Sequence, residues 1–282
     1  MSVAFAMTAL CLSNPSAQQA QNPSPMVEHT RAHVRLTAPP PEGQRVALQL
    51  GTLFVPNGLK KKARLVMHFH GDPLIPETAA AKLGGTVVIS INLGVGSGTY
   101  GRPFADAALF ARLVAEAEAK SHLTLSPIIL SSWSAGYGAT RAILRVPASY
   151  ARVDGVVLLD SMHADYDGAP NTGPDNESVL AQNDVAIFLQ FARDAVAGRK
   201  RMIITHSELF PGTYASTTET TDWLVAQLGL KSKAVLKWGP GGMQQLSELR
   251  AGGLRILGFA GNSAPDHVDQ FEALPQILRM IK

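Results

Sequence analysis

The arrangement of hydrophobic and polar residues changes near residue 60 of the chain. Before it, residues 33–37 and 46–55 alternate in part between apolar and polar positions, which predicts edge strands. After it, short continuous apolar runs rich in Val, Ile and Leu predict strands covered on both faces, as in a parallel sheet. These runs cover residues 65–69, 86–91, 126–130, 155–159, 201–205 and 254–259.

Amphipathic stretches separate the apolar runs and predict helices. Because buried strands alternate with helices, we expect an α/β fold with one mostly parallel sheet and helices on both faces. In such sheets ligands bind beyond the carboxyl ends of the strands, so the residues after each strand are the candidates for function. The predicted helices cover residues 104–120, 135–145, 179–197, 218–228 and 268–281.

The composition is that of an ordinary globular chain. The 282 residues are 46% hydrophobic and 17% charged, which suits a single core. The net charge of +3 is small and the basic residues are scattered, so we expect no nucleic-acid partner. The oligomeric state is not indicated.

The first 29 residues differ from the rest. Residues 3–12 form an apolar run and residues 13–20 are small and polar, which resembles a secretory signal peptide, although no Lys or Arg precedes the run. The run is too short to span a bilayer. Residues 21–29 have the composition of a flexible linker. We therefore predict a signal peptide over 1–20, export to the periplasm or medium, and a catalytic domain over 30–282 without disulfides, since the only cysteine is Cys11.

A serine lies between small residues where a predicted strand passes directly into a predicted helix. Such a sharp strand-to-helix turn exposes a side chain and tolerates only small neighbours. Here the chain resembles the α/β-hydrolase family, whose motif is GxSxG, with Ser132 in place of the first glycine, Ser134 as the serine and Gly136 as the last glycine. The resemblance implies that Ser134 is a nucleophile on an α/β-hydrolase fold with no large cap domain and no cofactor.

The turn after residues 65–69 contains a histidine–glycine pair, His70 and Gly71. In α/β hydrolases such a pair positions a backbone amide that stabilises the anionic oxygen of the tetrahedral intermediate. The resemblance therefore implies an oxyanion hole formed by the N–H groups of Asp72 and Ala135. Gly71 would let the backbone approach the substrate closely.

The same turn allows a second interpretation. His68, His70 and Asp72 form an HxHxD pattern, whose side chains could hold a metal ion as in metallo-β-lactamase-like hydrolases. That motif continues with a further histidine, and here the position is Pro73, which cannot ligate. A buried histidine packed in the core is an alternative for His68.

A histidine and two carboxylates complete the expected site. His267 follows residues 254–259, where α/β hydrolases have the general base of the serine. Asp160 follows residues 155–159 and Glu208 follows residues 201–205, and either could orient the imidazole. We prefer Asp160, because Asp is the commoner residue in this role and no Asp follows the later strand, and keep Glu208 as the alternative.

The expected reaction is hydrolysis of carboxylic esters, small or polymer-derived, through an acyl-enzyme intermediate. Amide or peptide hydrolysis on the same triad, a metal-dependent hydrolase on His68, His70 and Asp72, and a binding protein without catalysis are the alternatives. Other polar residues that follow predicted strands include Ser161, Asp165 and Ser207. The residues expected to contact substrate are His70, Gly71, Tyr100, Trp133, His163, His206 and Tyr214.

Overall fold

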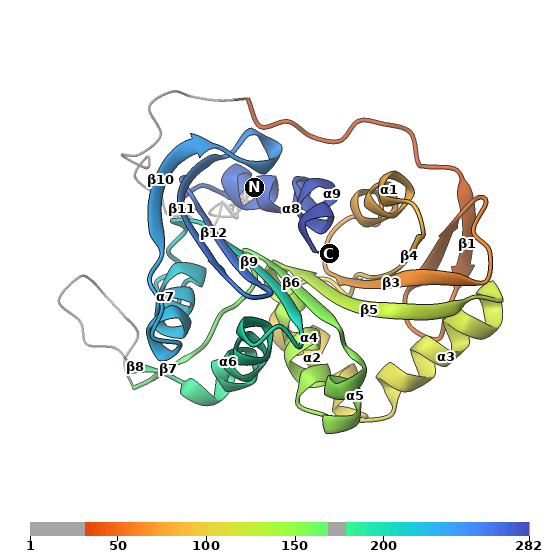
Figure 1. Cartoon of the computed structure of the whole chain (residues 1–282), viewed down its shortest axis with the longest axis horizontal. Coiled ribbons are helices and arrows are strands. Elements are labelled where there is room, and N and C mark those ends of the chain that lie inside the picture. The colour runs from red at the N-terminus through yellow and green to blue at the C-terminus, as the bar shows by residue number, and fades with distance from the viewer. Residues whose placement is uncertain (1–31, 169–178, 282) are drawn as a thin grey trace, which may run out of the picture.

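The computed structural model describes residues 32–168 and 179–281, so the predicted signal peptide and linker lie outside it. A ten-stranded sheet with the order β1-β2-β4-β3-β5-β6-β9-β12-β11-β10 forms the centre of the molecule (Figure 1). Its strands are β1 Gly43–Ala47, β2 Thr52–Pro56, β3 Lys62–Phe69, β4 Thr86–Ile91, β5 Thr124–Trp133, β6 Gly155–Leu159, β9 Arg201–His206, β10 Lys233–Trp238, β11 Gln244–Ala251 and β12 Leu254–Phe259. A separate pair consists of β7 Tyr166–Asp167 and β8 Val179–Leu180.

The middle of the sheet is parallel, from β4 through β3, β5, β6 and β9 to β12. All six predicted apolar runs lie in these strands. Every residue of β4 and of β6 is buried, which explains why their sequences are rich in Val, Ile and Leu. The prediction of a mostly parallel sheet is confirmed.

Helices cover both faces of the sheet, as predicted (Figure 1). Each face has its own hydrophobic cluster, one around Leu113 and Phe188 and the other around Phe271 and Ile277. The first cluster packs against α2 Ser97–Gly101, α3 Leu109–Ser121, α4 Tyr137–Leu144, α5 Pro147–Arg152, α6 Gln182–Val196 and α7 Thr217–Gln227, and the second against α1 Leu74–Leu83, α8 Ala264–Glu272 and α9 Leu274–Ile277. Short 3-10 turns are η1 Pro103–Ala105, η2 Ser134–Gly136, η3 Pro240–Gly242 and η4 Leu278–Met280.

The amino-terminal edge differs from the prediction. Residues 33–37 form no strand and instead cross the molecule as an extended segment before β1 (Figure 1). Residues 46–55 form a hairpin of β1 and β2 and not one strand. The chain reverses at Gly51, whose φ of +84° favours glycine, and the N–H of Leu48 donates to its carbonyl at 3.0 Å.

The other edge contains an unpredicted antiparallel hairpin, β10 with β11, paired to β12. β10 is the exposed outer strand, on which Leu236 and Trp238 are among the most exposed large apolar residues. Its pairing partner β11 is largely polar in sequence. Neither strand therefore carries the continuous apolar run by which the central strands were recognised. No helix within residues 32–168 and 179–281 is long and apolar enough to cross a bilayer.

Candidate active site

Ser134 lies at the sharp turn between β5 and α4. Its φ is +47°, in the left-handed region that non-glycine residues rarely adopt. A Cβ on Gly136 would lie 2.2 Å from the carbonyl oxygen of Phe69 at the end of β3. The small residue is therefore required because the turn passes directly over the neighbouring strand. The strain at Ser134 marks it as a candidate functional residue.

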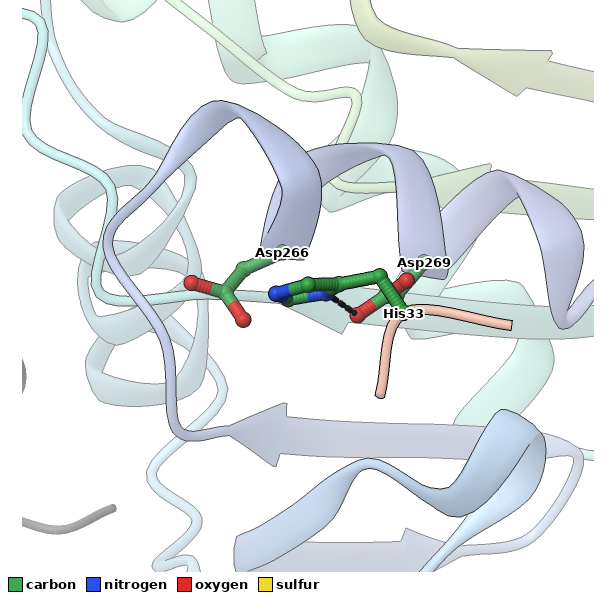
Figure 2. Close-up of side chains that lie close together, drawn as sticks. All are labelled: His33, Asp266 and Asp269. Atoms are coloured by element: carbon green, nitrogen blue, oxygen red, sulfur yellow. Dashed lines mark hydrogen bonds and ion pairs between the residues drawn. The ribbon is translucent and has the colours of Figure 1, made fainter. Parts of the chain in front are cut away.

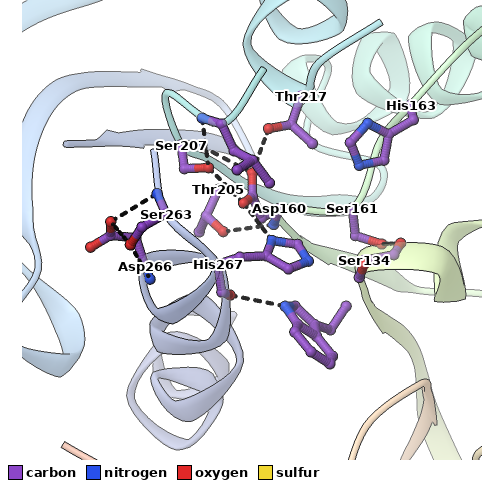
Figure 3. A network of polar contacts seen from close by, with 12 residues as sticks. Ser134, Asp160, Ser161, His163, Thr205, Ser207, Thr217, Ser263, Asp266 and His267 are labelled. Carbon is purple, nitrogen blue, oxygen red and sulfur yellow. Dashed lines mark hydrogen bonds and ion pairs between the residues drawn. The ribbon is translucent and has the colours of Figure 1, made fainter. Parts of the chain in front are cut away.

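Asp160 follows β6 and pairs with the histidine that follows β12. Nδ1 of His267 lies 2.7 Å from Oδ2 of Asp160, and Figure 3 shows the imidazole beside the carboxylate. Ser207 donates its N–H to Oδ1 at 3.0 Å and its hydroxyl to Oδ2 at 2.6 Å. The hydroxyl of Thr217 also donates to Oδ1. Asp160 is only 1% exposed, so these donors replace its hydration.

The protonation of this pair follows from its surroundings. Burial by itself would raise the pKa of Asp160, but the hydrogen bond and charge of His267, with the hydroxyls of Ser207 and Thr217, lower that pKa below its usual value. An ionised carboxylate only accepts hydrogen bonds, so Nδ1 of His267 donates. In the neutral ring Nε2 is then free to accept a proton. In the view of Figure 3 the imidazole lies between Asp160 and Ser134.

His267 lies in the first turn of α8, whereas the sequence placed it in a loop and began the helix at residue 268. Ser263 and Asp266 form a capping box at this helix start, and Pro265 follows the cap. This Ser-x-x-Asp signal was present in the sequence. The indole Nε1 of Trp133 donates to the carbonyl of His267 at 3.0 Å, which ties the helix to the end of β5.

The alternative acid, Glu208, is hydrogen-bonded to the backbone of Gly261. Its Oε2 accepts the N–H of Gly261 at 3.0 Å, and its own N–H donates to the carbonyl of Gly261 at 2.9 Å. Of the two carboxylates, Asp160 is thus the one hydrogen-bonded to Nδ1 of His267. Glu208 holds the loop that leads to α8.

The histidine–glycine turn follows β3, whose neighbour is β5. His70 has φ +74° and Gly71 has φ +105°. A Cβ on Gly71 would lie 2.5 Å from the ring of Phe271, so only glycine fits there. The exposed side chain of Asp72 accepts the N–H of Leu74 at 2.9 Å and so caps the start of α1. Asp72 and Ala135 thus follow the ends of two adjacent parallel strands.

The residues of the metal interpretation are engaged elsewhere. His68 is buried, and its ring nitrogens lie 3.0 Å from Oγ of Ser131 and 2.9 Å from the carbonyl of His70. Burial lowers the pKa of His68 to about 3, so the ring is neutral. Nδ1 of His70 is 2.7 Å from the hydroxyl of Tyr100. Asp72 is hydrogen-bonded to Leu74, and within the described residues these three side chains form no ligand cluster, so His68 is a core histidine.

Another group of possible metal ligands lies at α8, where Figure 2 shows His33 between Asp266 and Asp269. One ligand atom of each of the three residues lies within 4.8 Å of the others. Nδ1 of His33 is 2.8 Å from Oδ2 of Asp269, and Arg35 pairs with the other oxygen at 2.5 Å. The N–H of Leu36 also donates to Oε2 of Glu272 in α8 at 3.0 Å. The guanidinium of Arg35 therefore balances the charge of the buried Asp269, and these contacts attach the amino-terminal segment to the helix that carries His267.

Two of the expected substrate contacts form an aromatic wall beside His267. The ring of Trp133 stacks on His70 with centroids 4.9 Å apart and lies 4.9 Å from His267. Burial and the charge of His267 lower the pKa of His70, which keeps this wall uncharged. Tyr100 is 0% exposed and its hydroxyl is hydrogen-bonded to His70, so it supports the wall from the interior and is not accessible from solvent.

The remaining expected contacts follow β6 and β9. Nδ1 of His163 is 2.9 Å from the carbonyl of Ala215, and its ring meets Tyr214 edge-on at 5.0 Å. Burial lowers the pKa of His163. His206 instead contacts Oγ1 of Thr218 at 2.8 Å, and burial lowers its pKa also. Tyr214, 40% exposed, is accessible from solvent.

Sequence reasoning missed some of the supporting residues. Thr217 begins α7, 57 residues from Asp160, and nothing in the sequence links the two. Ser207 and Ser161 were noted as polar residues after strands without a role. Ser161 donates its hydroxyl to the carbonyl of Ser134 at 2.7 Å (Figure 3).

No protein-family model matches the sequence, and no curated protein matches it significantly. A solved structure of a double mutant of the esterase rPPE superposes with a TM-score of 0.51 at 12% identity, covering 88% of this chain and 83% of that chain. A thermostable esterase from Pseudomonas putida (TM-score 0.49, 11% identity, 88% and 83% covered) and an acetyl xylan esterase from Aspergillus awamori (0.43, 14%, 82% and 99%) are more distant. At these identities the likeness concerns the fold. Strand order and superposition together show that the chain has the α/β-hydrolase fold.

Proposed function

We propose that this protein is a serine hydrolase that cleaves carboxylic esters. The observation that carries the proposal is the buried Asp160–His267 pair at the end of the sheet where Ser134 is held at φ +47°. A nucleophile, a base and a residue that orients the base are the three groups that acyl transfer to a hydroxyl requires.

In the first half of the reaction, Oγ of Ser134 attacks the ester carbonyl carbon while Nε2 of His267 takes the hydroxyl proton. The imidazolium that forms is stabilised by the Asp160 carboxylate, which remains ionised. The negative oxygen of the tetrahedral intermediate would accept hydrogen bonds from the N–H groups of Asp72 and Ala135. The intermediate collapses when the C–O bond to the alcohol breaks and His267 protonates the leaving oxygen.

In the second half, water replaces the alcohol. His267 takes a proton from water, the hydroxide adds to the acyl carbon, and the bond to Oγ of Ser134 breaks with return of the proton to the serine. The products are a carboxylic acid and the free enzyme. His70, Trp133 and Tyr214 would supply an aromatic surface for the substrate, and no cofactor takes part in these steps.

The test is labelling of the purified protein with a fluorophosphonate, compared with Ser134→Ala and with an EDTA-treated sample. We expect stoichiometric labelling that disappears in Ser134→Ala and is unchanged by EDTA, together with hydrolysis of p-nitrophenyl esters. A wild-type protein that is not labelled would overturn the proposal. Hydrolysis lost to EDTA would favour a metal-dependent enzyme, and folded protein without labelling or hydrolysis would favour a binding role.

We also propose that the protein is exported, on the basis of the apolar run at residues 3–12. The test is amino-terminal sequencing of the protein recovered from the periplasm or medium of cells that express the whole chain. We expect a mature terminus near residue 20. An intact Met1 on protein that remains in the cytoplasm would contradict this.

A further inference from the structure

Two buried hydroxyls link β5 and the turn after β6 to the backbone of the nucleophile turn. Oγ of Ser132 lies 2.9 Å from Oγ of Ser161. Oγ of Ser161 in turn lies 2.7 Å from the carbonyl oxygen of Ser134 (Figure 3). Both serines are 0% exposed. A hydroxyl has one proton to donate and a carbonyl only accepts, so Ser161 donates to Ser134. Ser132 must then donate to Ser161. Both hydrogen bonds therefore point toward the carbonyl of Ser134.

The Ser134 carbonyl, which accepts the Ser161 hydroxyl, is covalently linked to the proposed oxyanion donor. The carbonyl of Ser134 and the N–H of Ala135 form a single planar peptide unit, in which the two bonds point in opposite directions. A hydrogen bond to the carbonyl therefore fixes the direction of the N–H. It also polarises the unit, which makes the N–H a stronger donor. The same carbonyl accepts the N–H of Tyr137, so two donors hold it.

We infer that Ser161, oriented by Ser132, is a positioning residue that aims and polarises the N–H of Ala135 toward the oxyanion of the intermediate. The inference rests on the proposed function, in which this N–H stabilises that oxygen. Ser161 itself is fully buried and does not touch substrate. The inference also gives Ser132, which replaces the first glycine of the GxSxG pattern, a specific task.

Ser161 also lies next to the residue that orients the general base. Ser161 directly follows Asp160, which is held at φ +44° and binds His267. The turn after β6 would therefore hold the general base through Asp160 and the oxyanion donor through Ser161. Removal of the Ser161 hydroxyl should affect only the oxyanion donor and not the base.

The experiment compares Ser161→Ala, Ser161→Cys and Ser132→Ala with the wild type. Ser149→Ala is the matched control, since Ser149 is also buried but lies on α5. For each protein, kcat and KM on p-nitrophenyl acetate, the pH profile of kcat, the unfolding midpoint and the inhibition constant of a short-chain trifluoromethyl ketone are measured. The ketone forms a hemiketal oxyanion on an active serine and so reports on the oxyanion donors.

For Ser161→Ala we expect a fall in kcat of about tenfold, since loss of a complete oxyanion donor costs about 100- to 1,000-fold and here the donor is only misdirected. The ketone should bind more weakly by the same factor, while KM and the pH profile of kcat stay unchanged because Asp160 and His267 are intact. Ser161→Cys, which keeps a weak donor, should recover part of the loss, and Ser132→Ala should lose less than Ser161→Ala. Ser149→Ala should match the wild type.

Two results would overturn the inference: kcat and ketone affinity of Ser161→Ala equal to those of the wild type, or a fall in kcat without a matching loss of ketone affinity. A shifted pH profile would also overturn it, because the hydroxyl would then act through the base. Wild-type protein that fluorophosphonate does not label would instead refute the proposed function and the inference with it. Labelled wild type with unaffected variants refutes the inference alone.

Discussion

The ends of β6 and β9 lie next to each other in the sheet, and each is followed by a carboxylate, yet the two acids have different surroundings. Asp160 directly follows β6 at φ +44° and accepts four hydrogen bonds, from the backbone and side chain of Ser207, from Thr217 and from His267. Glu208 binds the backbone of Gly261 and holds the loop before α8. The residues after β9 thus serve the acid of the neighbouring strand.

This difference shows that residues after one strand can hold in place a side chain that follows the neighbouring strand. Ser207, the first residue after β9, donates two hydrogen bonds to Asp160. Thr217, at the start of α7, adds a third. An acid on β6 is therefore held rigidly from β9 and α7, as a group that orients a catalytic base needs to be.

The largest expected effect is that of Asp160→Asn. The amide cannot accept the Nδ1 proton of His267 as the carboxylate does, and it would favour the wrong tautomer. We expect kcat on p-nitrophenyl acetate to fall by about three to four orders of magnitude, as the same substitution does in known Ser-His-Asp enzymes, with KM little changed. A fall of less than tenfold would remove Asp160 from the triad.

Ser207→Ala should have an intermediate effect, mainly on stability. Asp160 has a lowered pKa in the folded protein, so its carboxylate stabilises the fold fully above the ordinary carboxyl pKa of about 4. This contribution decreases below that pH and is lost only as the pH falls through the lowered pKa of the folded state. Loss of the Ser207 hydroxyl raises that pKa and should cost about 1.5–3 kcal/mol at pH 7, the range for hydrogen bonds to charged groups.

The measurement is the free energy of unfolding of the wild type, Ser207→Ala, Thr217→Val and Asp160→Asn from pH 7 down to the most acidic pH at which each remains folded. The difference between wild type and Ser207→Ala should be constant near neutral pH and shrink only as the pH falls toward the lowered folded-state pKa of Asp160, and Thr217→Val should behave alike. Asp160→Asn, which has no carboxyl to titrate, serves as the reference. A Ser207→Ala deficit that stays constant across the acidic range in which the wild type changes relative to Asp160→Asn would show that its hydroxyl does not act through the charge of Asp160.

The smallest expected effect is that of Glu208→Gln. The amide oxygen can still accept the N–H of Gly261, so the loop before α8 should keep its course, with a loss of about 0.5–1.5 kcal/mol in unfolding free energy at most. We expect kcat close to that of the wild type. A loss of kcat as large as that in Asp160→Asn would exchange the roles of the two acids.

The extent to which the fold could be predicted follows from the burial of its strands. The runs that became β4 and β6 are rich in Val, Ile and Leu because both faces of these strands are covered, and their sequences alone predicted them. β10 is an exposed edge strand and shows no such run, so pairing with β11, and not apolar periodicity, defines it. The hairpin of β1 and β2 was missed because the turn at Gly51 interrupts what otherwise resembles one strand.

The candidate site likewise contains residues that the sequence indicated and residues that only the tertiary structure reveals. Ser134, Asp160 and His267 could be singled out because each follows a recognisable strand and the carboxyl ends of parallel strands meet at one edge of the sheet. Ser161 and Thr217 act through hydroxyls placed by tertiary structure, and a serine or threonine after a strand is too common to indicate such a contact. His68 was correctly allowed a core role, which its two protein hydrogen bonds support.

The amino-terminal segment sets the order in which the molecule can be completed. His33 binds Asp269 of α8, and the two residues are 236 positions apart in the chain. Contacts of such long range form late, since their loop-closure cost must be met before they stabilise anything. During synthesis, His33 leaves the ribosome long before the helix that it binds has been made. This contact can therefore anchor the helix that carries His267 only after Asp269, 236 positions later, has been synthesised.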